Sequence, residues 1–180
     1  MNFELLQSEV VFHGRVFNVR RDHLSLPDGK VLVLDIVTHH GSVVLVPVDG
    51  EGKIWFVRQY RHSIGEELLE LPAGVLSPGE SAEDCALREI REEIGMSPEG
   101  LQRIGEFYLA PGYSTECMQV YLAQGLYSNP LLPDEGEYLQ VVTIPVAETY
   151  KMVMRGELRD TKSLAALHLS RSHLIDKWAT

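Results

Sequence analysis

The sequence of 180 residues lacks several features that would place it in a special class of protein. It contains no apolar run of the roughly 18 residues that a membrane-spanning helix requires, so no membrane partner is expected. Residues 1–15 lack the basic stretch and apolar core of a secretory signal. Only two cysteines, Cys85 and Cys117, are present, and they have no CxxC spacing. These observations favour free thiols in a reducing compartment, and we expect a cytoplasmic protein.

Positive charge is also scarce. The chain has 16 Lys and Arg residues but 26 Asp and Glu residues. The resulting net charge of −10 argues against nucleic acid as a partner. The seven histidines show no metal-ligand spacing, so we do not expect them to bind a metal. An acidic protein can still bind phosphate groups if its carboxylates first collect divalent cations that bridge to the phosphate oxygens.

The sequence predicts short strands, separated by turn residues, over most of the chain. Turns at residues 26–30 and 49–52 contain Asp-Gly pairs, and each predicts a hairpin between the runs that flank it. Strand-like alternation covers residues 10–26. The other expected strands are residues 31–37, 42–48, 53–60, 67–74, 101–110, 117–126 and 138–144.

Three segments predict helices: residues 81–94, about 146–155 and 160–175. In the first of them, apolar residues fall four apart and Gly95 follows as a natural stop. The order of elements predicts an α+β protein with a domain at residues 41–180 and a β-rich extension at residues 1–40.

The first predicted helix carries three acids on one face. Glu89, Glu92 and Glu93 are spaced i, i+3 and i+4, so their carboxylates project together within about one turn. Their mutual repulsion costs roughly 0.2–0.5 kcal/mol per pair, and hard divalent cations such as Mg²⁺ would offset it. A solvated acidic helix face, with Arg88 and Arg91 interspersed, is the other interpretation of the same pattern.

The residues before this helix favour the metal-binding interpretation. Gly74 and the Ser-Pro-Gly loop at residues 77–79 can bring backbone close to the acids and turn a carbonyl inward. Glu80 lies where a helix begins, a position that favours a carboxylate. Arg88 lies beside the acids and can orient a carboxylate through two charge-assisted hydrogen bonds. Together these residues predict a site that handles phosphate.

Residues 74–96 resemble the Nudix box. The pattern is Gly, five residues, Glu, seven residues, Arg-Glu, an aliphatic residue, any residue, Glu-Glu, any residue, Gly and a final aliphatic residue, for which Met96 is an acceptable substitute. The fixed positions are Gly74, Glu80, Arg88, Glu89, Ile90, Glu92, Glu93, Gly95 and Met96. The resemblance implies the Nudix fold, an α/β/α sandwich with a mixed sheet between helices, here with an antiparallel β extension. It also implies hydrolysis of a nucleoside diphosphate linked to another group.

Two further stretches resemble the ADP-ribose pyrophosphatase branch of that family. One is Val-Arg-Gln-Tyr-Arg at residues 57–61, which leads into Glu-Leu-Pro-Ala-Gly at residues 70–74. The other is residues 109–116, in which Pro111 lies 16 residues after Gly95. The resemblance therefore implies ADP-ribose or a related nucleoside diphosphate sugar as the substrate.

The resemblance assigns metal binding to the box. It implies that Glu89 and Glu93 are the main metal ligands, that Glu92 assists, and that the Ala73 carbonyl completes the shell. The metal would be Mg²⁺ or Mn²⁺, with more than one ion per site.

The resemblance also assigns roles in catalysis and substrate binding. Glu116 would take a proton from the attacking water, with Glu92 and Arg88 as further catalytic residues, while Glu80 and Arg88 would organise the loop before the helix. The residues expected to bind substrate are Arg58, Arg61, Glu70 and Gly112.

Two positions depart from the pattern of the branch. Leu34 stands where several relatives carry an arginine near the adenine, and Ser77 stands where some carry a glutamate. A hydrolase of GDP-mannose or of a UDP-sugar is therefore an alternative. A nucleotide-sensing module without catalysis is another, although the complete set of box acids argues against it. Relatives of this branch form homodimers through the β-rich extension, with substrate sites shared between subunits, so we expect a homodimer.

Overall fold

The computed structural model describes residues 3–132, 136 and 138–178. The chain divides into two compact units. The first consists of Met1–Gly41 and Tyr108–Cys117, and the second of Ser42–Phe107 and Met118–Thr180. The segment Tyr108–Cys117 thus belongs with the amino-terminal residues, although it is distant from them in the sequence.

The first unit contains a three-stranded antiparallel sheet, which confirms the predicted β extension. Its strands are β1 (Glu4–His13), β2 (Asn18–Ser25) and β3 (Val31–Thr38), in the order β1-β2-β3. The Asp-Gly turn joins β2 to β3 as predicted, with the Leu26 N–H donating to the carbonyl of Lys30 at 2.8 Å.

The continuous alternation predicted over residues 10–26 is interrupted in the structure. The Gly14 N–H donates to the Phe17 carbonyl at 2.9 Å and closes a turn between β1 and β2. A Cβ atom at Gly14 would crowd that carbonyl, so the turn requires glycine at this position. β1 also begins at Glu4, before the predicted strand. Alternation alone did not distinguish one long strand from two strands joined by a tight turn.

The second unit is built on a seven-stranded mixed sheet. The order along the sheet is β10-β5-β4-β9-β8, with β6 paired to β5 and β7 paired to β4. β4 and β9 are parallel, whereas β4 with β7 and β5 with β6 and β10 are antiparallel. The strands are β4 (Ser42–Val48), β5 (Lys53–Arg61), β6 (Glu66–Glu70), β7 (Ala73–Val75), β8 (Met96–Tyr108), β9 (Cys117–Ser128) and β10 (Leu139–Pro145).

The hairpin predicted around residues 49–52 exists only beside its turn. β4 and β5 pair at Val48 and Ile54 and then separate. Beyond that point β4 takes β7 and β9 as neighbours, while β5 takes β6 and β10. The turn was predictable from its residues, but the divergence of the strands was not, because it depends on partners that are distant in the sequence.

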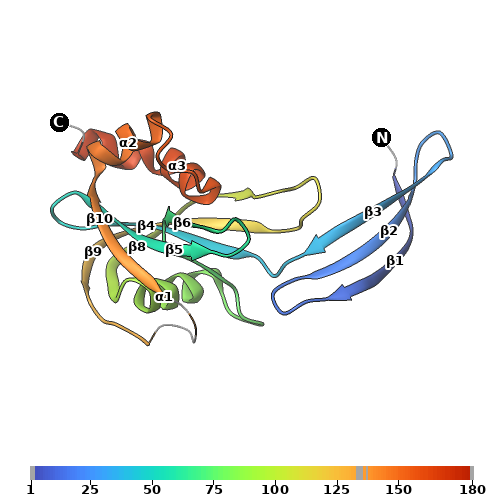
Figure 1. Ribbon diagram of the computed structural model, residues 1–180, viewed down its shortest axis with the longest axis horizontal. Helices are drawn as coiled ribbons and strands as arrows, with labels where there is room; N and C mark the ends of the chain where they lie inside the picture. Colours follow the sequence, from blue (N-terminus) through green and yellow to red (C-terminus); the bar gives the residue numbers. More distant parts are fainter. Residues whose placement is uncertain (1–2, 133–135, 137, 179–180) are drawn as a thin grey trace. The chain divides into compact units, whose positions relative to one another are not determined.

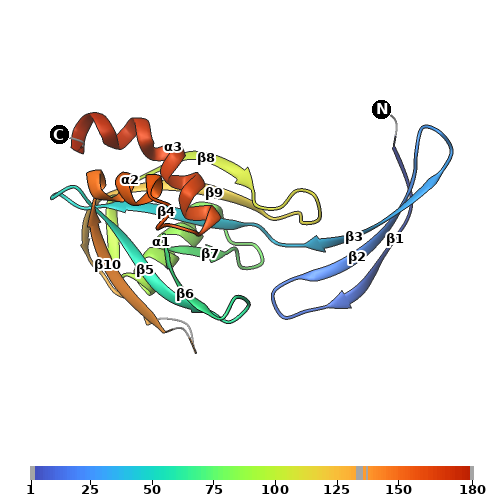
Figure 2. The ribbon, with the colours of Figure 1, turned by 45° about the horizontal axis from the view of Figure 1, so that its top comes forward.

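Helices cover both faces of this sheet. α1 (Ala82–Glu93) lies on one face, and α2 (Val146–Met154) and α3 (Thr161–Trp178) lie on the other (Figure 1). The turned view shows the same division (Figure 2). This arrangement confirms the predicted α/β/α sandwich. Among the helices of the described ranges, none has both the length and the hydropathy that crossing a membrane would require.

α1 begins and ends where the sequence predicts. The Ser81 hydroxyl caps its first turn by accepting a hydrogen bond from the Asp84 N–H at 3.1 Å. Gly95, just beyond its last turn, has a φ of 72°, a conformation that favours glycine. Between these ends, Cys85, Ala86 and Ile90 are buried in a core cluster with residues of β4, β5 and β9. Burial of this stripe fixes the rotation of α1, and with it the direction in which its acids point.

Candidate active site

The acids of α1 are held at the edge of the core. The residues Glu89 and Glu93 are only 9% and 8% exposed, which is unusual for glutamates unless other groups compensate their charge. Glu89 adjoins Ile90 and Glu93 adjoins Ile94, and both isoleucines are buried in the core cluster, so packing of the apolar stripe brings the two acids against the sheet. Glu92 is half-buried on the same helix. This burial excludes the interpretation of a fully solvated acidic face.

Gly74 of β7 meets the carboxylate of Glu89. A Cβ atom at Gly74 would overlap the carboxylate carbon and Oε1 of Glu89, so any other residue would displace this side chain. Gly74 does not have a positive φ, so the site requires glycine for close approach rather than for an unusual backbone conformation.

Arg88 joins the acids to the loop before the helix. Its Nη1 donates to Glu89 Oε1 at 2.7 Å and to Glu92 Oε2 at 2.8 Å. Its Nε and Nη2 donate to the two carboxylate oxygens of Glu80 at 2.8 and 3.0 Å. One guanidinium therefore fixes the orientation of three carboxylates, as expected of a planar group with several donors.

Glu80 closes the loop onto the helix. Its Oε2 accepts the Ser77 N–H at 2.9 Å in addition to the bonds from Arg88. The hydrogen bonds of Arg88 lower the pKa of Glu80 to about 2, and the same contacts raise the pKa of Arg88. Glu80 therefore carries its charge at all physiological pH values, and the loop at residues 77–79 stays attached to α1.

Glu93 contacts the strand that carries Gly74. The Ala73 N–H donates to Glu93 Oε2 at 3.2 Å, and Ala73 is paired with Val44 of β4. The backbone around Ala73 is therefore beside the acids, where the predicted carbonyl ligand would have to lie. That role of the Ala73 carbonyl stays a prediction.

The donor set fits a hard divalent cation in its chemistry. Carboxylate oxygens beside backbone are the ligands that Mg²⁺ and Mn²⁺ prefer. Within residues 3–132, 136 and 138–178, however, no three His, Cys, Asp or Glu side chains are already grouped to hold a metal. In this structure, Arg88 and the Ala73 N–H hold the acids of α1 in place.

Arg61 and Glu70 form a second polar cluster in the same unit. Arg61 Nε and Nη2 donate to the two oxygens of Glu70 at 2.7 and 2.6 Å. These hydrogen bonds raise the pKa of Arg61, and the nearby charge of Glu93 contributes to the same shift. Arg61 therefore lies within electrostatic range of the acids of α1.

Arg58 differs from Arg61 in its orientation. The two residues are three positions apart on β5, and side chains at an odd spacing on a strand point to opposite faces of the sheet. The face that carries Arg61 also carries Val57, which packs in the core cluster with α1. The predicted contact of Arg58 with substrate stays a prediction.

Asp160, just before α3, and Lys162 and Ser163 in its first turn belong to the Arg61 cluster, and no sequence motif indicates them. Lys162 Nζ donates to Glu70 Oε2 and, at 2.9 Å, to Asp160 Oδ2. The Ser163 hydroxyl accepts the Leu71 N–H at 2.7 Å. Asp160 three residues before Ser163 resembles a helix cap, but no local pattern indicates contact with β6.

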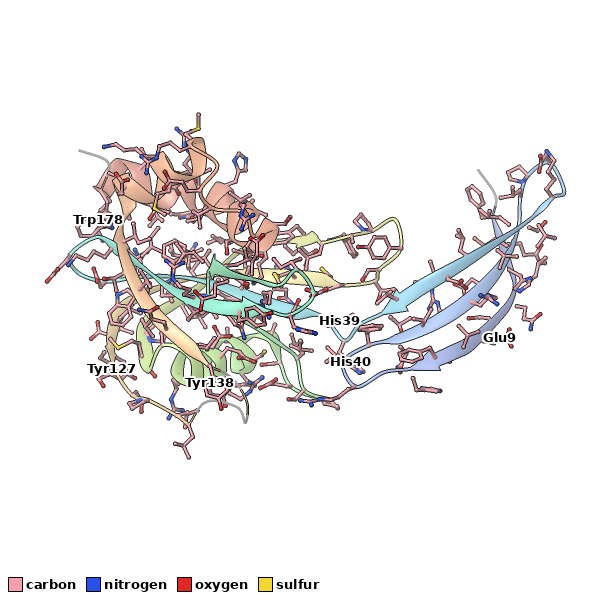
Figure 3. All side chains as sticks on the ribbon, viewed as in Figure 1. Glu9, His39, His40, Tyr127, Tyr138 and Trp178 are labelled. Carbon is pink, nitrogen blue, oxygen red and sulfur yellow. The ribbon has the colours of Figure 1, made fainter. Side chains whose placement is uncertain are left out.

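Glu116 and Gly112 lie in the first unit, in the loop between β8 and β9. Gly112 is exposed in a turn that the Ser114 N–H closes by donating to the Ala110 carbonyl at 2.8 Å. Glu116 Oε1 is 4.0 Å from Nδ1 of His39, whose side chain is 8% exposed. His39 directly follows β3 (Figure 3).

The loop that carries Glu116 is attached to the end of β3 by backbone hydrogen bonds. The Val37 N–H donates to the Tyr113 carbonyl at 2.7 Å, and the Thr115 N–H donates to the Val37 carbonyl at 2.9 Å. The His39 N–H donates to Thr115 Oγ1 at 3.0 Å. The position of Glu116 within this unit is therefore set by the backbone of residues 37–39.

Comparisons with known proteins identify similar chains. The family model described as NUDIX domain matches residues 38–167. The ADP-ribose pyrophosphatase of Mycobacterium tuberculosis is 37% identical over 169 residues, which cover 92% of this chain and 82% of that protein. The ADP-ribose pyrophosphatase of Bacillus subtilis is 35% identical over 164 residues, covering 90% and 89%.

A solved structure has the same fold over the whole length of this chain. It is described as a crystal structure of ADP compounds hydrolase, and it aligns with a TM-score of 0.89 at 27% sequence identity. The alignment covers 100% of this chain and 98% of that chain.

Proposed function

This chain belongs to the NUDIX family, and from that premise we propose that it hydrolyses the pyrophosphate bond of ADP-ribose or a related nucleoside diphosphate sugar. The products would be a nucleoside monophosphate and a sugar phosphate. The observation that carries the proposal is the network in which Arg88 binds Glu80, Glu89 and Glu92. A folded, fully acidic box of this kind supports catalysis over a purely sensing role.

Members of the family generally use a divalent metal, and we assign its binding to Glu89, Glu93, Glu92 and the Ala73 carbonyl. Mg²⁺ or Mn²⁺, with more than one ion per site, would supply positive charge against the diphosphate and Lewis acidity toward water. Arg88 orients Glu89 and Glu92 so that their oxygens face the same side of α1.

The remaining steps use residues outside the box. A water oxygen attacks one phosphorus, the bridging P–O bond breaks, and the bridging oxygen leaves with the other phosphate. Glu116 accepts the proton of that water. Arg61, Arg58 and Gly112 bind the substrate, and Glu70 takes part through its two hydrogen bonds to Arg61.

A hydrolase of another nucleotide sugar, such as GDP-mannose or a UDP-sugar, is the second candidate. Leu34 favours it, because an apolar residue stands where several ADP-ribose hydrolases carry an arginine. Side-chain contacts to the base decide between such substrates, whereas the acids of α1 would serve all of them.

A substrate panel tests the proposal. Phosphate release through a coupled phosphatase would be measured in Mg²⁺ with ADP-ribose, GDP-mannose, UDP-glucose, dinucleoside polyphosphates and nucleoside triphosphates. We expect preference for ADP-ribose and loss of activity in EDTA. Preference for another nucleotide sugar would select the second candidate. A folded protein without EDTA-sensitive activity on any of them would contradict both and favour the sensing module.

We also propose that the protein is a homodimer formed through the first unit. Every residue of β1 is exposed, and large apolar side chains are exposed on both β1 and β3. Leu5 and Leu32 are each paired with Leu24 of β2, so these three leucines form an apolar row across the sheet. A three-stranded sheet with such a surface is typical of an interaction site, and its edge strand can pair with a second copy.

We place the protein in the cytoplasm. Cys85 is a free thiol in the structure, and its burial raises its pKa to about 12. A free, buried thiol suits a reducing compartment.

A further inference from the structure

The amino-terminal end of α3 carries a buried cluster of charged groups that the box does not include. Lys162 donates to Glu70 Oε2 and to Asp160 Oδ2. Glu70 is 1% exposed and Lys162 is 8% exposed, so both charges are almost completely removed from water. Asp160 also accepts hydrogen bonds from the backbone and hydroxyl of Ser163, at 3.1 and 2.5 Å.

Because Glu70 is buried, its charged form depends on the cations that neighbour it. Burial alone would raise the pKa of this carboxyl group, but the hydrogen bonds and charges of Arg61 and Lys162 outweigh it and lower the pKa. A buried carboxylate without compensating charge is costly, so loss of either cation would change where Glu70 lies. Lys162 therefore helps to keep both oxygens of Glu70 in the position that Arg61 requires.

Arg61 is the exposed member of the cluster. Its side chain is 42% exposed, against 2% for Glu70 and 10% for Lys162. The bonds to Glu70 use Nε and Nη2, and Nη1 has no hydrogen-bond partner among the residues that the structure describes. A guanidinium held along one edge leaves its other edge for an anion, the geometry in which arginine recognises phosphate.

The same cluster fixes the start of α3 to the segment between β6 and β7, which leads into the box. The Leu71 N–H donates to the Ser163 hydroxyl, and Leu71 lies two residues before Ala73. At its other end, α3 is fixed by Trp178, whose ring packs against the backbone of Gly52. α3 is thus anchored at both ends, so it can act as a rigid support for Glu70.

We propose that Lys162 is a positioning residue for substrate binding, which acts through Glu70 to hold Arg61 against the diphosphate of the substrate. The proposal rests on the proposed function, because it concerns how the nucleotide sugar is bound. It assigns to α3 a part in the site that lies outside the box. Arg61 makes the contact with substrate, and Lys162 determines its orientation without touching the substrate.

The experiment compares Lys162→Met with Lys162→Arg, and with Lys151→Met as a control in an exposed position of α2. We expect Lys162→Met to raise KM for ADP-ribose about tenfold and to leave kcat within about twofold, because the change affects binding geometry and not the acids of α1. Lys162→Arg keeps the charge and a donor for Glu70, so its KM should stay within about threefold of wild type. Lys151→Met should leave both constants unchanged.

A double-mutant cycle with Arg61→Ala separates positioning from general destabilisation. If Lys162 acts through Arg61, Lys162→Met should change kcat/KM less than about twofold in the Arg61→Ala background. An undiminished tenfold loss in that background, or an equal fall in kcat, would overturn the proposal. If Lys162→Met does not fold, judged by thermal unfolding, Lys162→Gln takes its place in the cycle.

The two proposals fail in different ways. The cycle is also measured as the Kd for ADP-ribose by calorimetry in Ca²⁺, which does not require turnover. Wild-type protein that binds ADP-ribose without cutting it would contradict the proposed hydrolysis, while a non-additive cycle in Kd would still support the role of Lys162. Active wild-type protein with an additive cycle would contradict only the role of Lys162.

Discussion

At the scale of single residues, the site depends on close contact between Gly74 and Glu89. The backbone of β7 approaches the carboxylate so closely that no side chain fits between them. Arg88 also holds this carboxylate, because its Nη1 donates to Glu89 Oε1 at 2.7 Å. The position of Glu89 therefore depends both on the lack of a side chain at Gly74 and on the guanidinium of Arg88.

Gly74→Ala tests this contact. The added methyl group would displace Glu89, so we expect kcat to fall at least about 100-fold and the free energy of unfolding to fall by about 1–3 kcal/mol. Steady-state kinetics and urea unfolding measure the two effects. Gly50→Ala is the control, because a Cβ atom there meets no neighbour within 4 Å. Normal activity in a folded Gly74→Ala protein would show that Glu89 is not held as described.

Glu93→Gln tests the acids themselves. It removes one charge from a residue that is 8% exposed and nearly preserves its shape. We expect kcat to fall about 100- to 1,000-fold, because several kcal/mol of electrostatic stabilisation are lost, with little effect on folding. Glu83→Gln, on an exposed position of the same helix, is the matched control. Near-normal turnover of a folded Glu93→Gln protein would refute the assignment of Glu93.

At the scale of elements, α1 and the loop before it behave as one part. The Ser81 cap, the Glu80–Arg88 pair and Gly95 fix its two ends, and the buried stripe fixes its rotation. A shift of one residue in the position of the cap, the ion pair, the glycine or the buried stripe would turn the acids away from β7. The fixed spacing of the box follows from this requirement.

Glu80→Gln tests the attachment of the loop through its dependence on pH. The pKa of Glu80 falls from 4.5 to about 2 on folding, so its stabilising effect is fully present above pH 4.5 and is lost as the pH falls toward 2. At pH 7 we expect Glu80→Gln to lower the free energy of unfolding by about 1–2 kcal/mol. Urea titrations from about pH 7 to pH 3 should show the difference from wild type shrinking below pH 4.5. A difference that stays constant would contradict this role.

The elements show how far the sequence could predict the structure. α1 was predictable because its cap, its stripe and its stop are all local signals. The separation of β4 from β5 beyond Val48 was not, because alternation does not say which strand becomes the neighbour.

The candidate site was likewise predictable only in part from the sequence. The spacing of the box placed Glu80, Arg88 and Glu89 together, as the structure has them. Lys162 was missed because it is 92 residues from Glu70, and only the packing of α3 brings the two together.

At the scale of the whole molecule, the amino-terminal sheet has an exposed apolar surface. Residues on β1 and β3 leave large apolar side chains in water, including Leu5 (55% exposed) and Val33 (48% exposed). A homodimer would bury this surface.

Light scattering after size exclusion tests the dimer. We expect wild-type protein at micromolar concentration to have twice the chain mass of 20.2 kDa. The variant with Leu5→Asp and Leu32→Asp should be a monomer, because each change places a charge in the apolar row. Gln7→Asp, at an exposed polar position of β1, should remain a dimer. A monomeric wild type would contradict the proposal.

Product analysis tests the central claim most directly, because it identifies the bond that is cut. ADP-ribose would be incubated with wild-type protein in Mg²⁺, with and without EDTA, and the products separated by ion-exchange chromatography. We predict equal amounts of AMP and ribose 5-phosphate, formed only in the absence of EDTA. Intact ADP-ribose, or ADP with free ribose, after incubation with folded protein would contradict hydrolysis of the pyrophosphate bond.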